Sequence, residues 1–271
     1  MMNNFFCKFI EWIAFLVSPL FRLFVNASFP KSIQRRCLDI FFYLISFKPT
    51  DSKYYNFSSI QSFFTRAPSE NQSFKGEISS PVEGFLYACD YVKNASLFHI
   101  KGLPYSLYEL IPFDYANLMK DALFHSIYLS PQDCHRVFVP LNADLISIDY
   151  IGGDCRPVRD LWMRNYPNLF CRNERCVFRF QNDDWDVVLV MIAALNVGGI
   201  QIDILPNLGP FIGKKHSSQR FFEGKMACGQ GSRLATFLLG SSIVLMTSPR
   251  KKYSELKLKK SQKIMIGNSL I

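Results

Sequence analysis

Apolar side chains dominate the first fifty residues in a pattern that predicts helices. A dense apolar stretch runs from Phe5 to Phe24, and its longest run without a charge, Trp12 to Phe21, has 10 residues. A helix that crosses a bilayer needs about 20 apolar residues. A second apolar segment, Ile40 to Phe47, follows the basic pair Arg35-Arg36. We predict that both segments are helices lying in a membrane interface, with apolar faces in the lipid and basic side chains at the headgroups.

Two other interpretations of this region stay open. The helices can instead pack on the protein's own core, although the density of Phe and Trp beside basic residues favours membrane contact. A signal peptide is the second, but Glu11 interrupts its apolar part and a small-x-small cleavage site is lacking.

From Ile78 onward the pattern changes to short runs typical of β-strands. The runs 177–180 and 185–192 flank four polar residues, which predicts a hairpin, and the second run is apolar on both faces like a buried strand. Residues 197–204 alternate as a half-buried strand does. Near the end of the chain, Gly240-Ser241-Ser242 joins the apolar runs 236–239 and 243–246, and such a sequence is usually a turn.

Helices followed by strands predict an α+β chain, with N-terminal amphipathic helices and a β-rich, mostly antiparallel core. We divide the chain into a membrane-docking helical region at 1–50, a β-rich core at 51–248 and a basic C-terminal tail at 249–271.

The composition and the charge distribution narrow the class of protein. The 271 residues are 49% hydrophobic, 20% charged and 15% aromatic, which excludes a disordered, collagen-like or coiled-coil chain. Of the net charge of +9, residues 1–50 carry +4 and residues 249–271 carry +6, so the body carries −1. Nucleic-acid-binding domains usually carry basic charge on the folded body. Basic ends on a neutral body fit an anionic membrane surface better, and we expect no nucleic-acid partner.

The 8 cysteines form no CxxC pair and no Cys/His array with zinc-ligand spacing, so we expect no metal site. Scattered cysteines of this kind are typical of reduced thiols. We therefore expect the main domain to face a reducing compartment.

Each candidate for chemistry is weak when taken alone. His135 lies in a polar segment, where a lone histidine is usually structural or exposed. Glu83 follows Ser79-Ser80-Pro81-Val82, a sequence typical of a turn with a solvated carboxylate.

The order and spacing of six blocks change this picture, because together they resemble the successive blocks of phosphatidylserine decarboxylases over roughly residues 55–248. The apolar, basic N-terminal region is similar to that family's membrane-docking helices. The blocks are Ser62 to Arg66 (SFFTR), Ser80 to Gly84 (SPVEG), Lys101 to Leu107 (KGLPYSL), Tyr128 to Val137 (YLSPQDCHRV), Asn168 to Arg175 (NLFCRNER) and Phe237 to Ser242 (FLLGSS).

The resemblance implies a pyruvoyl enzyme that cleaves itself between Gly240 and Ser241. The Ser241 hydroxyl would attack the Gly240 carbonyl, and elimination would then leave a ketone at the head of the chain 241–271. That ketone would accept the electrons released when phosphatidylserine loses CO₂ to become phosphatidylethanolamine. The resemblance assigns His135 to the decarboxylation step. The implied partners are phosphatidylserine in an anionic membrane and the protein's own cleaved chain 241–271, and a homodimer stays open.

Two departures from the family pattern fall at positions thought to serve self-cleavage. The family's Pro-x-Asp-Gly reads Pro81-Val82-Glu83-Gly84, and the second histidine of His-Arg-x-His-x-Pro is Phe138. Phe138 cannot take a proton, and loss of a general base commonly costs about 10²–10⁴ in rate. A smaller departure is Ile192-Ala193-Ala194, where the family has Val-Gly-Ala.

Two hypotheses follow. The first is an active, peripheral membrane decarboxylase, on the cytoplasmic side if the cell is bacterial, in which His135, another histidine such as His125, or Glu83 acting through water replaces the missing base. The second is a degenerate, uncleaved family member that binds a lipid or a partner without decarboxylase activity.

Overall fold

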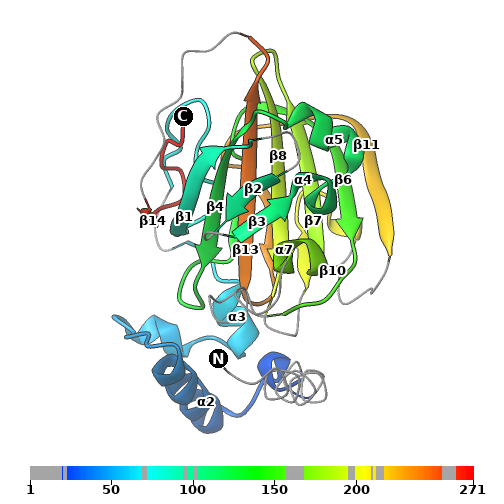
Figure 1. Cartoon of the computed structure of the whole chain (residues 1–271). Helices are drawn as coiled ribbons and strands as arrows, with labels where there is room; N and C mark the ends of the chain where they lie inside the picture. Colours follow the sequence, from blue (N-terminus) through cyan, green and yellow to red (C-terminus); the bar gives the residue numbers. More distant parts are fainter. Residues whose placement is uncertain are drawn as a thin grey trace.

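The computed structural model consists of two antiparallel sheets that pack face to face, with helices on the outer side of the larger sheet and at one end (Figure 1). The class is α+β with a β-rich core, as the sequence predicts. The structure describes residues 20, 23–68, 72–93, 97–100, 103–156, 168–194, 199–208, 210–211, 217–251 and 261–271.

The larger sheet has eight strands in the order β11-β6-β7-β8-β13-β4-β1-β14, so that β13 lies near its middle. In that order the strands are Ser218–Cys228, Ala143–Ile151, Arg175–Gln181, Trp185–Ala193, Ser241–Pro249, Leu123–Leu129, Gly84–Tyr91 and Gln262–Ile264.

The smaller sheet has four strands in the order β10-β9-β12-β5. They are Pro210–Phe211, Ile200–Ile202, Arg233–Phe237 and Arg136–Phe138, and a separate hairpin consists of β2 (Leu97–Ile100) and β3 (Leu103–Ser106). The helices are α2 (Lys31–Leu44), α3 (Ile60–Phe64), α4 (Leu107–Leu110), α5 (Phe113–Leu118) and α7 (Leu169–Arg172), with 3-10 turns η1 (Ser52–Tyr55) and η2 (Pro206–Leu208).

The two faces of the larger sheet bury different side chains, because successive residues of a strand point to opposite sides. One face forms a core with the smaller sheet, where Ile243 and Leu245 of β13 meet Val137 and Phe237. We call this space the inner layer. The other face, which carries Val244, is covered by α4, α5, α7 and the β2–β3 hairpin (Figure 1).

The predicted hairpin is confirmed. β7 and β8 pair from Arg175↔Ile192 to Gln181↔Asp186, and β8 is buried along its whole length. The strand predicted at 197–204 corresponds to the shorter strand β9. Its half-buried Gln201 lies between two buried isoleucines, which is the predicted alternation, and residues 197–198 lie outside the described residues.

Gly240-Ser241-Ser242 is not a turn, and this prediction was wrong. Ser241 and Ser242 are the first residues of β13, where Ser241 pairs with Leu129 on one side and Ala193 on the other. The apolar runs on either side of the block belong to different sheets, since β12 lies in the smaller one. The block therefore carries the chain from one sheet to the other.

The last eleven residues pack into the body of the protein. β14 pairs with β1 and forms the edge of the larger sheet, Ile264 and Leu270 are buried, and the amide of Leu270 donates to the carbonyl of Ile78 at 2.8 Å. Residues 261–271, the last part of the predicted basic tail, thus belong to the same fold as β13.

The N-terminal helices pack on the end of the larger sheet at which β13 begins (Figure 1). One face of α2, formed by Gln34, Leu38 and Phe42, is buried against α3. The predicted apolar stretch 5–24 lies almost entirely outside the described residues. Among the helices of the described ranges, none is long and apolar enough to span a membrane.

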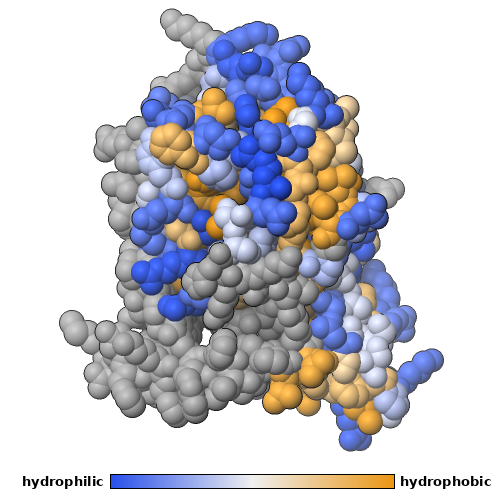
Figure 2. All heavy atoms as spheres, turned by 90° about the vertical axis from the view of Figure 1, so that its right-hand side faces the viewer, coloured by the Kyte–Doolittle hydropathy of each residue, from blue (hydrophilic) through white to orange (hydrophobic). Residues whose placement is uncertain are grey.

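A second apolar face of α2 has no cover in the described structure. Ile33, Ile40 and Leu44 lie seven and four residues apart, which places them on one side of the helix, and they are 49%, 62% and 73% exposed. Leu20 and Leu23 are exposed as well. Apolar side chains also gather at the lower end of the molecule in Figure 2, where the N-terminal helices lie.

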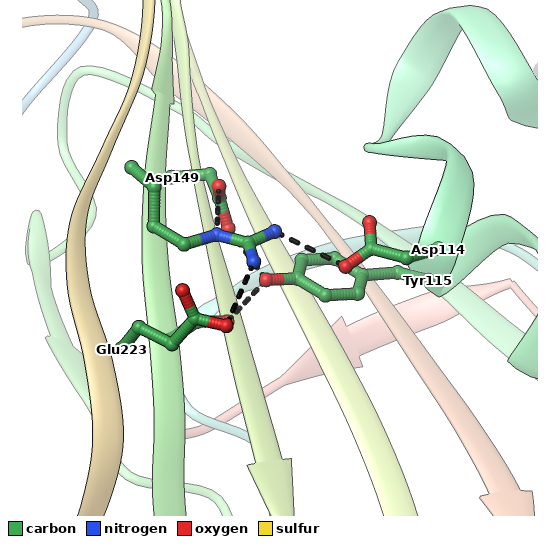
Figure 3. A network of polar contacts seen from close by, with 6 residues as sticks. Asp114, Tyr115, Asp149 and Glu223 are labelled. Atoms are coloured by element: carbon green, nitrogen blue, oxygen red, sulfur yellow. Dashed lines mark hydrogen bonds and ion pairs between the residues drawn. The ribbon is translucent and has the colours of Figure 1, made fainter.

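A polar network joins α5 to the edge of the larger sheet (Figure 3). The guanidinium of Arg220 on β11 binds Asp149 at 2.8 Å, Asp114 at 3.1 Å and Glu223 at 3.2 Å, and the Tyr115 hydroxyl donates to Asp149 at 2.7 Å. Alternation on β6 places Asp149 on the helical side of the sheet, away from the inner layer.

Candidate active site

Ser241, the first residue of β13, points into the inner layer. Its side chain has the same orientation as those of Ile243 and Leu245, because the strand alternates with period two. The residue is 1% exposed, and its hydroxyl has no hydrogen-bond partner in the described structure. Leaving a buried hydroxyl without a partner costs about 1–3 kcal/mol, and such groups occur where chemistry needs them free. Ser242, equally buried, points to the helical side.

The carbonyl that Ser241 would attack is held by a backbone donor. The amide of Ala194 donates to the Gly240 oxygen at 3.0 Å, one step beyond the paired residues Ala193 and Ser241. A donor fixed on a carbonyl stabilises the negative charge that develops when a nucleophile adds to it. Sequence reasoning does not find this group, since a backbone amide leaves no mark in the sequence.

His135 also lies on the inner-layer side and is completely buried, so of the two predicted environments, structural or exposed, the exposed one is wrong. It precedes β5 and has the same orientation as Val137, and its carbonyl accepts from the amide of Phe237 at 3.0 Å. Phe237 ends the strand that leads to Gly240. The backbone of His135 is thus hydrogen-bonded directly to the segment that leads to Gly240.

The protonation of His135 follows from its contacts. Nδ1 lies 2.9 Å from the carbonyl oxygen of Asp133, which can only accept, so Nδ1 carries the proton and Nε2 carries the lone pair. Nε2 is buried and has no hydrogen-bond partner within the described ranges. Burial lowers the pKa of His135 to about 4, so the ring is neutral at pH 7. His135 is therefore able to accept a proton through Nε2.

Glu83 is placed beside the backbone of the His135 loop. Its carboxylate accepts a short hydrogen bond from the amide of Cys134. The opposite side of the loop is bound by Lys263 of β14, which pairs with Asp133. Burial raises the pKa of the Cys134 thiol, which donates to the Arg66 carbonyl at 3.5 Å. These contacts make Glu83 a support for the loop.

Phe138, at the family's second histidine position, faces away from the inner layer. It follows Val137 on β5 and therefore points to the opposite side. Its ring packs on Phe74 with centroids 6.0 Å apart, and its amide donates to the Pro81 carbonyl at 2.9 Å. At the position where the resemblance implies a histidine, the structure thus has an aromatic contact.

His125 is too far along β4 to act on Ser241. The register pairs Ser241 with Leu129 and Leu245 with His125. Four residues of an antiparallel strand span about 13 Å. Of the groups considered as a replacement base, His125 is thus excluded by the register.

The N-terminal helices close this end of the inner layer. Leu239 is buried in the same cluster as Phe63, Phe64 and Leu38. The Phe64 ring meets the His135 imidazole edge-on, with centroids 4.8 Å apart. Both the residue before Gly240 and the imidazole therefore contact the helical region.

The comparisons with known proteins agree with this architecture. The family model for phosphatidylserine decarboxylase matches residues 60–271. The chain belongs to the phosphatidylserine decarboxylase family.

Several curated members of that family are similar along most of the chain. A phosphatidylserine decarboxylase proenzyme of Alcanivorax borkumensis is 29% identical over 221 residues, covering 79% of this chain and 76% of its own. Proenzymes of the same name from Shewanella sediminis and Psychromonas ingrahamii are each 32% identical, covering 70% and 73% of this chain and 69% and 71% of their own.

Within this family member, the structure gathers Gly240, Ser241 and His135 at one end of the inner layer, with Glu83 behind the His135 loop. The structure also brings two residues to this site that the sequence did not single out, Ala194 and Glu174. Glu174 lies in the block 168–175. The sequence signalled that block only through its resemblance to the family.

Proposed function

We propose that the protein is a membrane-associated phosphatidylserine decarboxylase that forms its pyruvoyl group by cleaving itself between Gly240 and Ser241. One observation carries the proposal. A buried serine hydroxyl without a partner follows a carbonyl that is already hydrogen-bonded to a backbone amide, and a buried imidazole with a free lone pair faces the same layer.

His135 takes the role of the base in this proposal. Nε2 accepts the proton of the Ser241 hydroxyl as Oγ bonds to the Gly240 carbon, while the Ala194 amide stabilises the developing oxyanion. The bond between the Gly240 carbon and the Ser241 nitrogen then breaks, and the nitrogen takes up the proton. The result is an ester between Gly240 and the Ser241 oxygen.

The second stage releases the N-terminal chain. Loss of the Ser241 Cα proton and cleavage of its Cβ–Oγ bond free the Gly240 carboxylate, and water then replaces the nitrogen as ammonia to leave a ketone. That ketone supplies the electron sink for loss of CO₂ from an amino acid headgroup. The unpartnered Ser241 oxygen and the His135 lone pair fit the formation of such a group at this position.

The cleaved chain 241–271 would stay bound. It contains β13, which is paired on both sides, and β14, whose Lys263 binds Asp133 in the His135 loop. Cleavage would therefore leave the larger sheet and the His135 loop intact.

The N-terminal helices support attachment to the membrane that holds the substrate. The buried face of α2, with Leu38 and Phe42, belongs to the same Phe-rich cluster as Leu239, which precedes Gly240, and the exposed apolar face of α2 lies on another side of this helix. Docking of that face on an anionic bilayer would bring lipid headgroups to the end of β13 where Ser241 lies.

The deciding experiment is the intact mass of the full-length protein under denaturing conditions, with Ser241→Ala as the control. We expect the wild-type chain to give a fragment of residues 241–271 with a blocked N-terminus, and the variant to remain a single species near 31.3 kDa. The cleaved protein should then release CO₂ from phosphatidylserine. An uncleaved wild-type chain would favour the alternative, a degenerate member that binds lipid without decarboxylase activity, which the packing of Phe138 on Phe74 supports.

A further inference from the structure

We infer that Glu174 is a positioning residue for self-cleavage, a role that rests on the proposed function. Glu174 is completely buried and precedes β7. Its orientation matches that of Cys176 and Phe178, which places the carboxylate in the inner layer with Ser241. Burying a carboxylate is costly unless hydrogen bonds or an opposite charge compensate for the lost water.

Glu174 lies in the same row across the sheet as the cleavage site. The Ala193 amide donates to its carbonyl at 2.9 Å, and Ala193 is in turn paired with Ser241. The row therefore reads Glu174, Ala193, Ser241. The residue between the carboxylate and the serine is an alanine, so no large side chain separates them.

The first contact of Glu174 fixes the donor on the Gly240 carbonyl. The backbone carbonyl of Glu174 accepts from the Ala193 amide. The side-chain amide of Asn173 donates to the Ala193 oxygen at 3.0 Å. Asn173 is completely buried as well. With both backbone groups of Ala193 bound, the next amide, that of Ala194, is aimed at the Gly240 oxygen.

The second contact fixes the other end of the cleavage block. The Glu174 carboxylate accepts from the Gly199 amide at 3.2 Å and from the Tyr150 hydroxyl at 3.1 Å. The Gly199 carbonyl accepts from the Leu238 amide at 3.0 Å. Gly199 has φ +106°, and a Cβ there would lie 2.9 Å from the Leu238 side chain, so the two segments are in close contact.

Glu174 thus holds both segments that bind the run from Leu238 to Gly240. The backbone of Ala193 and Ala194 binds its C-terminal end, and Gly199 binds its N-terminal end. Displacement of a reacting group by about 1 Å commonly costs 100-fold in rate. Removing the carboxylate keeps the backbone contact with Ala193 but should release Gly199, and the Gly240 carbonyl should then loosen because Gly199 no longer fixes Leu238, two residues before it.

The test compares self-cleavage in the full-length wild type, Glu174→Ala, Glu174→Gln and the control Asp149→Asn. Asp149 is a buried carboxylate of the Arg220 network on the opposite face of the sheet (Figure 3). We expect Glu174→Ala to cleave about 100-fold more slowly. Glu174→Gln keeps an acceptor for the Gly199 amide and should stay within about tenfold of wild type. Asp149→Asn should lose stability and cleave at the wild-type rate.

Hydroxylamine identifies the blocked step, because it cleaves an accumulated ester, and the rescue by Glu174→Gln separates positioning from a loss of fold. The uncleaved Glu174→Ala chain should resist hydroxylamine, because we expect the reaction to stop before the ester forms. Release of the fragment by hydroxylamine would place Glu174 in the elimination step and overturn the inference. Unchanged cleavage in Glu174→Ala, equal losses in Asp149→Asn, or a Glu174→Gln chain as slow as Glu174→Ala would also overturn it. A wild-type chain that does not cleave would overturn both the proposed function and this inference. That result is distinguishable, because the wild type is measured before any variant is made.

Discussion

The Nδ1 atom of His135 lies 2.9 Å from the carbonyl oxygen of Asp133, and this contact leaves Nε2 as the nitrogen that can act as a base. Under the proposed function, His135 would serve as the base in place of the histidine that the resemblance implies at position 138. Its imidazole is buried, and its Nε2 has no hydrogen-bond partner among the described residues.

The first prediction concerns the pH dependence of self-cleavage. Because burial lowers the pKa of His135 to about 4, Nε2 stays unprotonated well below pH 6.5. We expect the rate to be nearly constant from pH 7.5 to about 5 and to fall as the pH approaches 4. The measurement is a pH-jump on chain made by cell-free synthesis, followed by gel separation of the fragments. A tenfold fall per pH unit beginning near 6.5 would mean that an ordinary histidine, rather than His135, is the base.

The same pKa has a consequence for stability. Between pH 6.5 and 4 the unfolded chain binds a proton at His135 and the folded chain does not, so the folded state is destabilised as the pH falls through this window. The loss approaches roughly 3 kcal/mol at pH 4. Above pH 6.5 this group contributes no slope. Urea titrations of Ser241→Ala with and without His135→Asn should show a shallower acid loss in the double variant, and identical slopes would contradict the assignment.

Position 138 offers a direct test of the departure from the family. Phe138 points toward Phe74 and away from the layer that holds Ser241. We expect Phe138→His to leave the cleavage rate within about threefold and to lower stability by about 1 kcal/mol through the lost aromatic contact. Phe138→Leu is the matched control, because it loses the ring without adding a base. A large gain in cleavage for the histidine variant alone would show that residue 138 reaches the site.

The architecture could be predicted further from the sequence than the site could. The hairpin of β7 and β8 was predicted from two strand-like runs on either side of four polar residues, because a polar turn between two such runs leaves a local mark in the sequence. Gly240-Ser241-Ser242 was mistaken for a turn, because glycine and serine mark turns locally and the partners of β13 lie more than 45 residues away along the chain. Tertiary pairing overrode the local preference.

Burial explains why the site itself was harder to predict. The polar neighbours of His135 predicted a structural or exposed histidine, and the structure shows a completely buried imidazole that meets Phe64, in a loop that Glu83 and Lys263 bind from both sides. These contacts join residues about 50 and 130 positions apart, and no local pattern carries them. The backbone donor of Ala194 depends entirely on register.

The backbone donor on Gly240 can be removed without changing a side chain of the site. Ala194→Pro lacks the amide proton, and the preceding residue is in a strand, as the residue before proline prefers. We expect cleavage to fall by about 10²–10³, the usual cost of losing one such donor. Ala194→Gly keeps the amide and should cleave within about threefold of wild type. If both variants cleave alike, the hydrogen bond to Gly240 does not contribute to catalysis.

Membrane attachment is testable on the exposed face of α2. Replacing Ile33, Ile40 and Leu44 by serine removes three apolar side chains from that face and leaves the buried residues Leu38 and Phe42 in place. Each large aliphatic side chain contributes about 1.5–3 kcal/mol when fully buried in lipid, so we expect the triple variant to bind phosphatidylserine vesicles at least 100-fold more weakly. Phe113→Ser, which removes a 70% exposed ring from α5, is the control and should bind as the wild type does. Sedimentation with sucrose-loaded vesicles measures both, and intact-mass analysis shows whether cleavage persists.

Deletion of residues 1–36 should abolish binding, and unchanged binding in the deletion or the triple variant would mean that another surface docks on the membrane.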